Sequence, residues 1–162
     1  MIEAVVWLVG LTVLAALGSG LIAGVFFAFS AFVMRALSRL PPHQGIAAMK
    51  AINLAVLTPW FFAAFFGTAA ACVVLAIAML LRWGEPGAIL VLAGSLLYLV
   101  GSILVTMLRN VPLNDALTAA AADSGEGALL WMRYLAAWTA WNHVRTAASL
   151  AAAASFTFAL MR

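Results

Sequence analysis

Long runs without a single charged residue constrain this chain more than any other feature. Residues 4–34, 51–81 and 86–108 contain no Asp, Glu, Lys or Arg, and residues 134–161 contain only Arg145. About 20 apolar residues in helical form cross the hydrocarbon layer of a bilayer, which is roughly 30 Å thick. The runs therefore predict an all-α, polytopic membrane protein. We expect one domain over residues 1–162, an antiparallel bundle of four transmembrane helices at about 4–34, 51–81, 88–108 and 134–161.

Composition and the single cysteine support this class. Hydrophobic residues make up 67% of the chain and charged residues 8%, whereas a soluble domain carries about 25% charge. The first apolar run has no basic residue before it and is longer than the core of a signal peptide, so we expect it to stay as a helix. Cys72 is the only cysteine, which excludes an intramolecular disulfide and a metal site built on cysteines.

The distribution of basic residues predicts the orientation. The net charge is +3, but the basic residues are scattered over loops and form no patch for nucleic acid. Two predicted loops on the same side, 35–50 and 109–133, hold Arg35, Arg39, Lys50, Arg109 and Arg133, and the opposite side holds only Arg82 and Arg162. The positive-inside rule therefore places both loops in the cytoplasm and both termini outside, in a multi-pass protein of the inner (plasma) membrane.

Small residues and prolines predict how the helices pack. A stripe of small residues in the first helix favours close approach of another helix; its members are Ala16, Gly20, Gly24 and Ala28. Pro59 lies inside the second predicted helix and predicts a kink there. Residues 114–127 form the longest polar loop, in which residues 119–122 are expected to make a short surface helix.

The few polar residues inside the spans mark the candidate site. No Asp, Glu or Lys lies well inside a predicted span, which argues against a carboxylate proton pump, a cation site and a di-iron bundle. Asn53 is expected to open the second helix, Asn110 and Asn114 to close the third, and residues 138–146 to begin the fourth. An antiparallel topology brings all of these to the cytoplasmic end.

On the fourth helix the spacing i, i+3, i+4, i+7 predicts one stripe of Trp138, Trp141, Asn142 and Arg145, with His143 about a quarter-turn away. Each residue has a structural and a functional interpretation. The arginine either extends to the lipid headgroups or holds an anionic ligand. The histidine either bridges helices or transfers a proton, the asparagines either join helices or bind a substrate, and the tryptophans either mark the membrane interface or stack on a ligand.

Four segments carry a resemblance to a known family over nearly the whole chain. They are residues 24–30 (GVFFAFS), 45–53 (GIAAMKAIN), 110–115 (NVPLND) and 138–146 (WTAWNHVRT). In these segments the chain resembles the anthrone oxygenases, which are small four-helix membrane proteins.

The resemblance implies oxidation of a flat tricyclic anthrone to an anthraquinone by O2, without metal, flavin or another cofactor. In that chemistry His143 would be the base, Arg145 with Asn142 or Asn53 would hold the enolate oxygen, and Trp138 would stack on the rings with Trp141. Asn110 and Asn114 complete the candidate substrate-binding set. The implied partners are a lipophilic small molecule, O2 and the lipid bilayer, with no nucleic acid.

Two other classes of function stay open. The first is a non-enzymatic membrane module that binds a lipophilic molecule or a partner protein, in which the polar residues only join helices. The second is a haem or quinone protein, for which His43 would have to fold back from its loop toward His143. Ion transport is disfavoured, because the spans contain no charged pair and the chain shows no inverted repeat. Homo-oligomerisation is left open.

Overall fold

The computed structural model describes the backbone of residues 2–162 and the side chains from residue 6 onward, and this part of the chain contains no β-strand. The prediction of an all-helical chain is confirmed. The α-helices, in order, are α1 (Ile2–Ala28), α2 (Met34–Leu37), α3 (Pro42–Ala55), α4 (Pro59–Leu81), α5 (Ala88–Tyr98), α6 (Val111–Ala119) and α7 (Gly125–Ala159). Three π-helical stretches, Phe29–Val33, Leu99–Leu104 and Thr106–Asn110, join α1 to α2 and α5 to α6.

Three of the described segments are long and apolar enough to cross a membrane. They are Val6–Leu37, Pro59–Leu81 and Ala88–Ala119. The fourth long helix, α7, has 35 residues and carries more polar side chains. The chain is therefore a helical protein with several helices suited to a bilayer.

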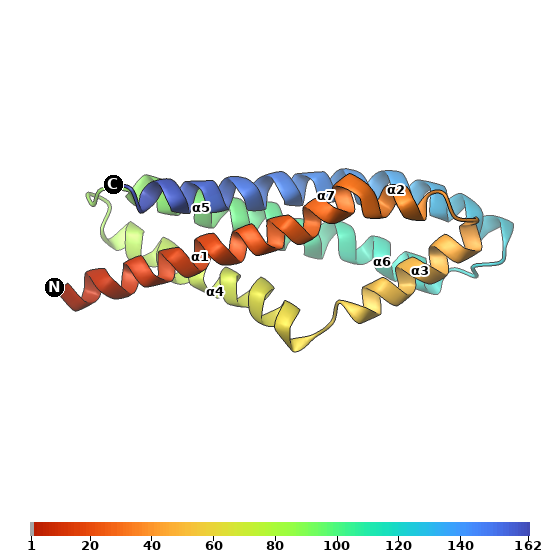
Figure 1. Cartoon of the computed structure of the whole chain (residues 1–162), viewed down its shortest axis with the longest axis horizontal. Coiled ribbons are helices and arrows are strands. Elements are labelled where there is room, and N and C mark those ends of the chain that lie inside the picture. Colours follow the sequence, from red (N-terminus) through yellow and green to blue (C-terminus); the bar gives the residue numbers. More distant parts are fainter. Residues whose placement is uncertain (1) are drawn as a thin grey trace.

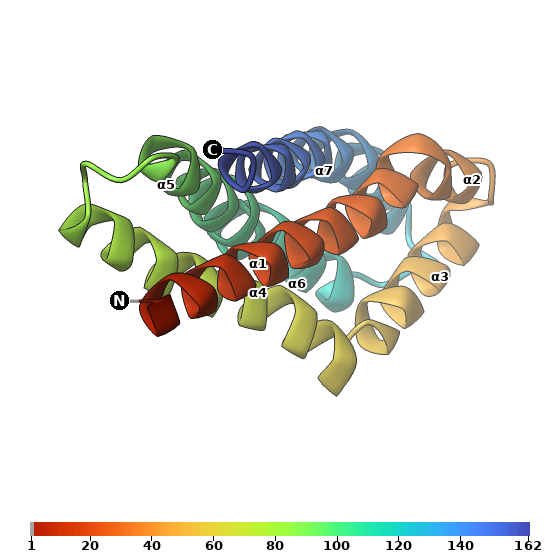
Figure 2. The same cartoon turned by 60° about the vertical axis from the view of Figure 1, so that its left-hand side comes forward.

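Four helices lie side by side along the long axis of the molecule. α1 contacts α7 and α4, and α5 contacts the same two helices. Figure 1 shows both termini and the α4–α5 turn at one end, with the α2–α3 and α6–α7 turns at the other. Figure 2 shows the same order after rotation. α7 is about 52 Å long at 1.5 Å per residue, so it runs the whole length of the molecule.

The second helical segment is broken rather than kinked. Residues 51–81 were expected to form one helix, but α3 ends at Ala55 and α4 begins at Pro59. Proline disfavours helical conformation in the residue before it, and Thr58 is extended (φ −108°, ψ 152°). The Thr58 hydroxyl accepts a hydrogen bond from the N–H of Phe61 at 3.2 Å and so caps the new helix. Figure 1 shows the resulting change of direction between α3 and α4.

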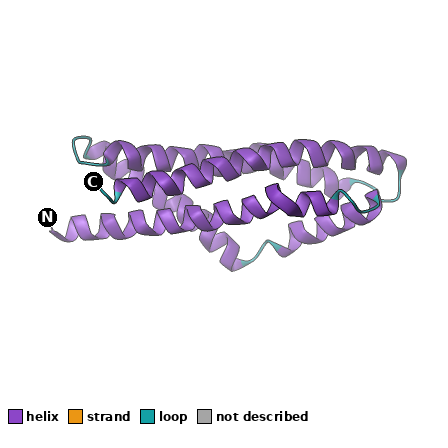
Figure 3. Ribbon diagram, turned by 45° about the horizontal axis from the view of Figure 1, so that its top comes forward, coloured by secondary structure: helices purple, strands orange, loops and turns teal. Residues whose placement is uncertain are grey.

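The remaining helix ends also differ from the sequence-based bounds. The third segment continues to Ala119 instead of ending at 108, and α7 begins at Gly125 instead of 134. Pro112 lies in the first turn of α6, where its missing N–H is tolerated. The surface helix expected over residues 119–122 is wrong, because Ala120 is extended. The predicted loops 35–50 and 109–133 are mostly helical (Figure 3).

Two hydrophobic cores follow each other along the bundle. The first fills the space between α1, α4, α5 and α7, where the hydroxyl of buried Tyr98 donates to the carbonyl of Phe65 at 3.0 Å. The second lies among α2, α3, α6 and the first half of α7, and it contains Met34, Leu37, Ile46, Met49, Leu117, Trp131, Tyr134 and Trp138. The end of the molecule that holds the α2–α3 and α6–α7 turns thus has its own hydrophobic core.

Two glycines of the small-residue stripe, Gly20 and Gly24, do not mediate close helix packing, so the prediction is wrong at these positions. A Cβ added at Gly20 or Gly24 would meet nothing within 4 Å. Close approach occurs instead at Gly18, where an added Cβ would collide with the Thr68 side chain of α4, and at Gly101, where it would collide with Ala148 of α7. A periodic stripe identifies a helix face, but it does not say which face is turned inward.

Candidate functional site

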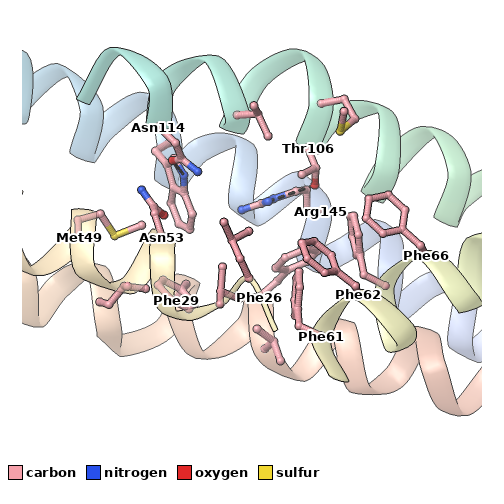
Figure 4. A pocket seen from close by; sticks show the side chains of 18 residues that line it. Phe26, Phe29, Met49, Asn53, Phe61, Phe62, Phe66, Thr106, Asn114 and Arg145 are labelled. Carbon is pink, nitrogen blue, oxygen red and sulfur yellow. Dashed lines mark hydrogen bonds between the residues drawn. The ribbon is translucent and has the colours of Figure 1, made fainter. Parts of the chain in front are cut away.

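A cavity of about 260 Å³ lies where the two cores meet. Seven aromatic side chains contribute to its wall: Phe26, Phe29, Phe61, Phe62, Phe65, Phe66 and Trp138. Its polar lining consists of Asn53, Thr106, Asn114 and Arg145, and no lining residue is acidic. Figure 4 shows Asn53 and Asn114 at one end, Phe62 and Phe66 at the other, and Arg145 between them. The cavity is an aromatic chamber with one polar end.

Arg145 is the only charged group of this lining, and it is 4% exposed. Its Nη1 donates to the Thr106 hydroxyl at 3.2 Å and its Nη2 to the Asn142 Oδ1 at 2.7 Å, while its Nε has no partner. The guanidinium carbon lies 4.1 Å from the Phe26 ring centre and 5.0 Å from that of Trp138. Aromatic faces attract a cation, but they accept no hydrogen bond from the Nε. The cavity lining therefore contains a positive charge with one unused N–H donor.

Asn142 holds this arginine in place from behind the cavity wall. The Asn142 Nδ2 donates to the carbonyl of Phe26 at 2.7 Å and to the Ser30 hydroxyl at 2.8 Å, and its Oδ1 accepts from Arg145. The Ser30 and Thr146 hydroxyls lie 3.1 Å apart. These contacts tie α7 to the π-helical part of the first segment, and π-helical stretches are frequent at functional sites. The network fixes the direction of the guanidinium.

The polar end of the cavity has a second unused donor. The Asn114 Oδ1 accepts from the Tyr134 hydroxyl at 2.8 Å and from the Trp138 Nε1 at 2.9 Å. The Asn53 Nδ2 is buried without a partner. An unpaired buried amide is costly unless something occupies the site. Asn53 and Arg145 thus both line the cavity, and each has one buried N–H donor without an acceptor.

The structure brings together four of the predicted site residues and separates the others. Asn53, Asn114, Trp138 and Arg145 line the cavity. Asn110 is buried outside it, where its Nδ2 donates to the carbonyl of Trp138 at 3.2 Å, and Asn142 positions Arg145 from outside the lining. Asn53 lies in the last turn of α3, instead of opening the second helix, and Asn110 and Asn114 lie within a continuous helical segment.

His143 and Trp141 do not reach the cavity. Residues two positions apart on an α-helix point about 200° apart around its axis, so His143 points away from Arg145. It is exposed and lines a separate groove with Arg35. The Trp141 ring lies under the guanidinium of Arg109, 4.7 Å from its carbon. The expected stacking of Trp141 on a ligand and the expected base at His143 are not supported by this geometry.

The sequence did not identify Thr106 as a site residue, and it did not show which side chains of α4 line the cavity. Thr106 is a single hydroxyl in an apolar run, four residues before Asn110, and its contact to Arg145 depends on the register between two helices. The phenylalanines that follow Pro59 turn into the cavity because α4 starts in a new direction after the break. Within residues 2–162, no group of three or more His, Cys, Asp or Glu side chains is placed to hold a metal ion.

The anthrone oxygenase family matches residues 60–155, from the first turn of α4 to near the end of α7. The chain belongs to the anthrone oxygenase family. No curated protein and no solved structure matches the chain. The matched region includes the segments 110–115 and 138–146 and hence Asn114, Trp138 and Arg145 of the cavity. The segments 24–30 and 45–53 lie outside it.

Proposed function

We propose that this chain is an integral membrane oxygenase that oxidises an anthrone-like aromatic ketone to the quinone with O2. The observation that carries the proposal is Arg145, a buried guanidinium in an aromatic cavity without a carboxylate partner and with an unused Nε donor. A site of this kind suits a flat aromatic molecule whose oxygen becomes negatively charged during the reaction. Membership of the family supports the same chemistry.

The proposed placement in the bilayer has four spans. Arg109 lies over Trp141 on one side, and Arg82 and Arg162 lie at the other end of the molecule. The helix from Trp141 to Ala159 rises about 27 Å, close to the thickness of the hydrocarbon layer. The same layer fits α4 (Pro59–Leu81), which is flanked by Thr58 and Arg82. The second core then lies at the membrane surface, on the cytoplasmic side according to the basic residues.

The cavity in this placement opens toward lipid near the cytoplasmic boundary. Arg145 lies one turn inside Trp141, about 6 Å deeper. Four residues that line the cavity also have exposed side chains: Leu57, Phe62, Phe66 and Met107, with exposed fractions of 56%, 40%, 46% and 50%. An apolar substrate dissolved in the bilayer would enter between the α3–α4 break and the third helical segment. The chain would thus collect its substrate from the membrane.

The chemistry needs one ketone, one O2 and no further reactant. Loss of a proton from the methylene opposite the carbonyl gives an enolate, which passes one electron to O2. The resulting radical and superoxide combine into a peroxide anion at that carbon, which takes up the proton lost in the first step and becomes a hydroperoxide. Loss of the remaining C–H proton breaks the O–O bond, leaves a second carbonyl and releases water. The methylene carbon loses four electrons in total. Two of them reduce one oxygen atom of O2 to water, and the other two reduce the second atom, which becomes the new carbonyl oxygen of the quinone.

The residues of the cavity act on the first of these steps. Arg145 would donate to the substrate's carbonyl oxygen and stabilise the enolate, so that the methylene proton leaves more readily to water at the cavity mouth. The Asn53 amide offers a donor at the polar end, and Phe29 and Trp138, whose ring centres are 5.5 Å apart, form an aromatic corner against the substrate. His143 has no part in this scheme, because it faces a different groove.

The test compares two arginine variants, measured as oxygen uptake and quinone formation by the purified protein with an anthrone. We expect Arg145→Gln to lower kcat by about 10²–10³-fold, the usual effect of removing one oxyanion donor. Arg109→Gln is the matched control, since Arg109 also lies over an aromatic ring but is exposed outside the cavity. An unchanged rate of substrate-dependent oxygen uptake in Arg145→Gln would contradict the proposal. So would a wild-type protein that shows no substrate-dependent oxygen uptake.

A non-enzymatic module is the alternative, and the contacts of Arg145 to Thr106 and Asn142 favour it, because together with the bonds of Asn142 to Phe26 and Ser30 they join three helical segments as structural contacts do. In that case the wild type binds an anthraquinone without oxygen uptake on the anthrone. Arg145→Gln would then lower the melting temperature and leave no catalytic rate to compare. The same two proteins and the same assay therefore separate the enzyme from the module.

A further inference from the structure

A second hollow lies on the outside of the bundle, between α7 and the end of the first helical segment. It measures about 590 Å³, and its polar lining is Ser30, Arg35, Ser38, Thr139 and His143. The other lining residues are apolar, and none is acidic. The groove therefore carries an arginine and a histidine with no acidic residue in its lining, at the cytoplasmic boundary of the proposed bilayer.

The helix geometry brings Arg35 and His143 to nearly the same height. The Ser30 hydroxyl contacts that of Thr146 at 3.1 Å, so these two residues share one level along the bundle. The helical segments run antiparallel, and at 1.5 Å per residue Arg35 lies about 7.5 Å and His143 about 4.5 Å from that level, in the same direction. The two side chains are thus about 3 Å apart in height, within reach of one ligand.

That height coincides with the proposed membrane boundary. His143 lies two residues from Trp141, over whose ring the boundary arginine Arg109 lies. Lipid phosphates lie just outside this boundary, where the long Arg35 side chain can reach them. Deeper along the same two helices the surface is apolar, with Phe27 61% exposed and Val144 42% exposed. A molecule with an anionic headgroup and apolar chains matches this surface, with the headgroup at the groove and the chains along the deeper apolar residues.

We propose that this groove binds an anionic phospholipid, with its phosphate held by Arg35 and His143. Arg35 supplies charge and several N–H donors, His143 supplies a ring N–H, and Thr139, one turn farther along α7, supplies a hydroxyl. The acyl chains follow the apolar surface below. This explains an exposed histidine on a lipid-facing helix that the cavity chemistry does not use, and it is independent of the proposed oxygenase activity.

The test measures lipid binding to the purified full chain by native mass spectrometry in a mild detergent, with phosphatidylglycerol, phosphatidylcholine or inorganic phosphate added. We expect the wild type to bind phosphatidylglycerol at least about tenfold more tightly than phosphatidylcholine. Arg35→Gln should weaken phosphatidylglycerol binding at least about fivefold. Ala136→Trp, an exposed position in the groove, should abolish the preference by filling the site without changing the charge.

Arg39→Gln is the matched control, because Arg39 is exposed near the groove but does not line it. We expect it to change binding by less than about twofold. Equal losses in Arg35→Gln and Arg39→Gln would mean diffuse attraction to a basic surface and would overturn the site. A preference that survives Ala136→Trp would overturn it too, as would inorganic phosphate that binds as tightly as phosphatidylglycerol.

Discussion

Residues that are close in sequence have very different surroundings in this protein, as His143 and Arg145 show. They are two positions apart on α7, yet one is exposed in an outer groove and the other is buried in the cavity. A general base contributes about 10²–10⁴-fold to a rate. Because His143 faces away from the cavity, we expect His143→Gln to lower oxygen uptake on an anthrone by less than about tenfold. A loss of a hundredfold or more in a folded protein would restore His143 as the base.

Asn142 is the residue on which the position of Arg145 depends. Its side chain makes three hydrogen bonds, and replacing it by leucine leaves the Phe26 carbonyl, Ser30 and the Arg145 Nη2 without this partner. Each buried group left unpaired costs about 1–3 kcal/mol. We expect Asn142→Leu to lower the melting temperature in detergent by several degrees. Thr157→Ala, which removes an exposed hydroxyl bond within α7, should leave it nearly unchanged; equal effects would refute the network's role.

At this scale the sequence predicted the type of site residue better than its direction. Asn53, Asn114, Trp138 and Arg145 are polar or amphipathic residues in an apolar chain, and this alone marked them. Whether a residue enters the cavity depends on the rotation of each helix about its axis. The π-helical stretches and the break before Pro59 set that rotation. Neither follows from the spacing of residues, so the side chains of the other segments that face Arg145 could not be predicted. His143 lies on the regular helix α7, where spacing alone puts it about 200° from Arg145, and Trp141 lies at the edge of the stripe, against Arg109.

Among the helical elements, close packing depends on individual glycines rather than on the conspicuous stripe. Gly101 lies in a π-helical stretch where an added Cβ meets Ala148, whose short side chain cannot move aside. We expect Gly101→Ala to lower the free energy of unfolding by about 1–3 kcal/mol. Gly24→Ala has open space and should be neutral or slightly stabilising. Detergent unfolding midpoints of the two variants test this, and shifts of the same sign and size would contradict it.

The helices themselves were largely predictable, because long apolar runs have few alternatives in a bilayer. Their ends were not. Pro42–Ala55 and the first ten residues of α7 carry enough polar side chains to resemble loops, yet they are helical because they pack on the second core around Trp131 and Tyr134. Tertiary contacts, rather than local propensity, set these bounds.

For the whole molecule, the proposed four spans put both polar turns on one side of the membrane. In a Cys72→Ala background, single cysteines at exposed Gln44 and Asp123 should be labelled from the cytoplasmic side. A cysteine at exposed Glu85, and one in place of Arg162 at the end, should be labelled from the outside. If α7 does not cross, Asp123 and the end of the chain become accessible from the same side, which would contradict the four-span arrangement.

The proposed function requires that a planar aromatic ketone binds in the cavity with its oxygen on Arg145. An experimental structure of the protein with the anthraquinone product bound would test this. We predict ring density between the Trp138 corner and the phenylalanines of α4, with one carbonyl oxygen within hydrogen-bonding distance of the guanidinium. Density only on the outer surface, or a cavity closed by side chains, would contradict this account.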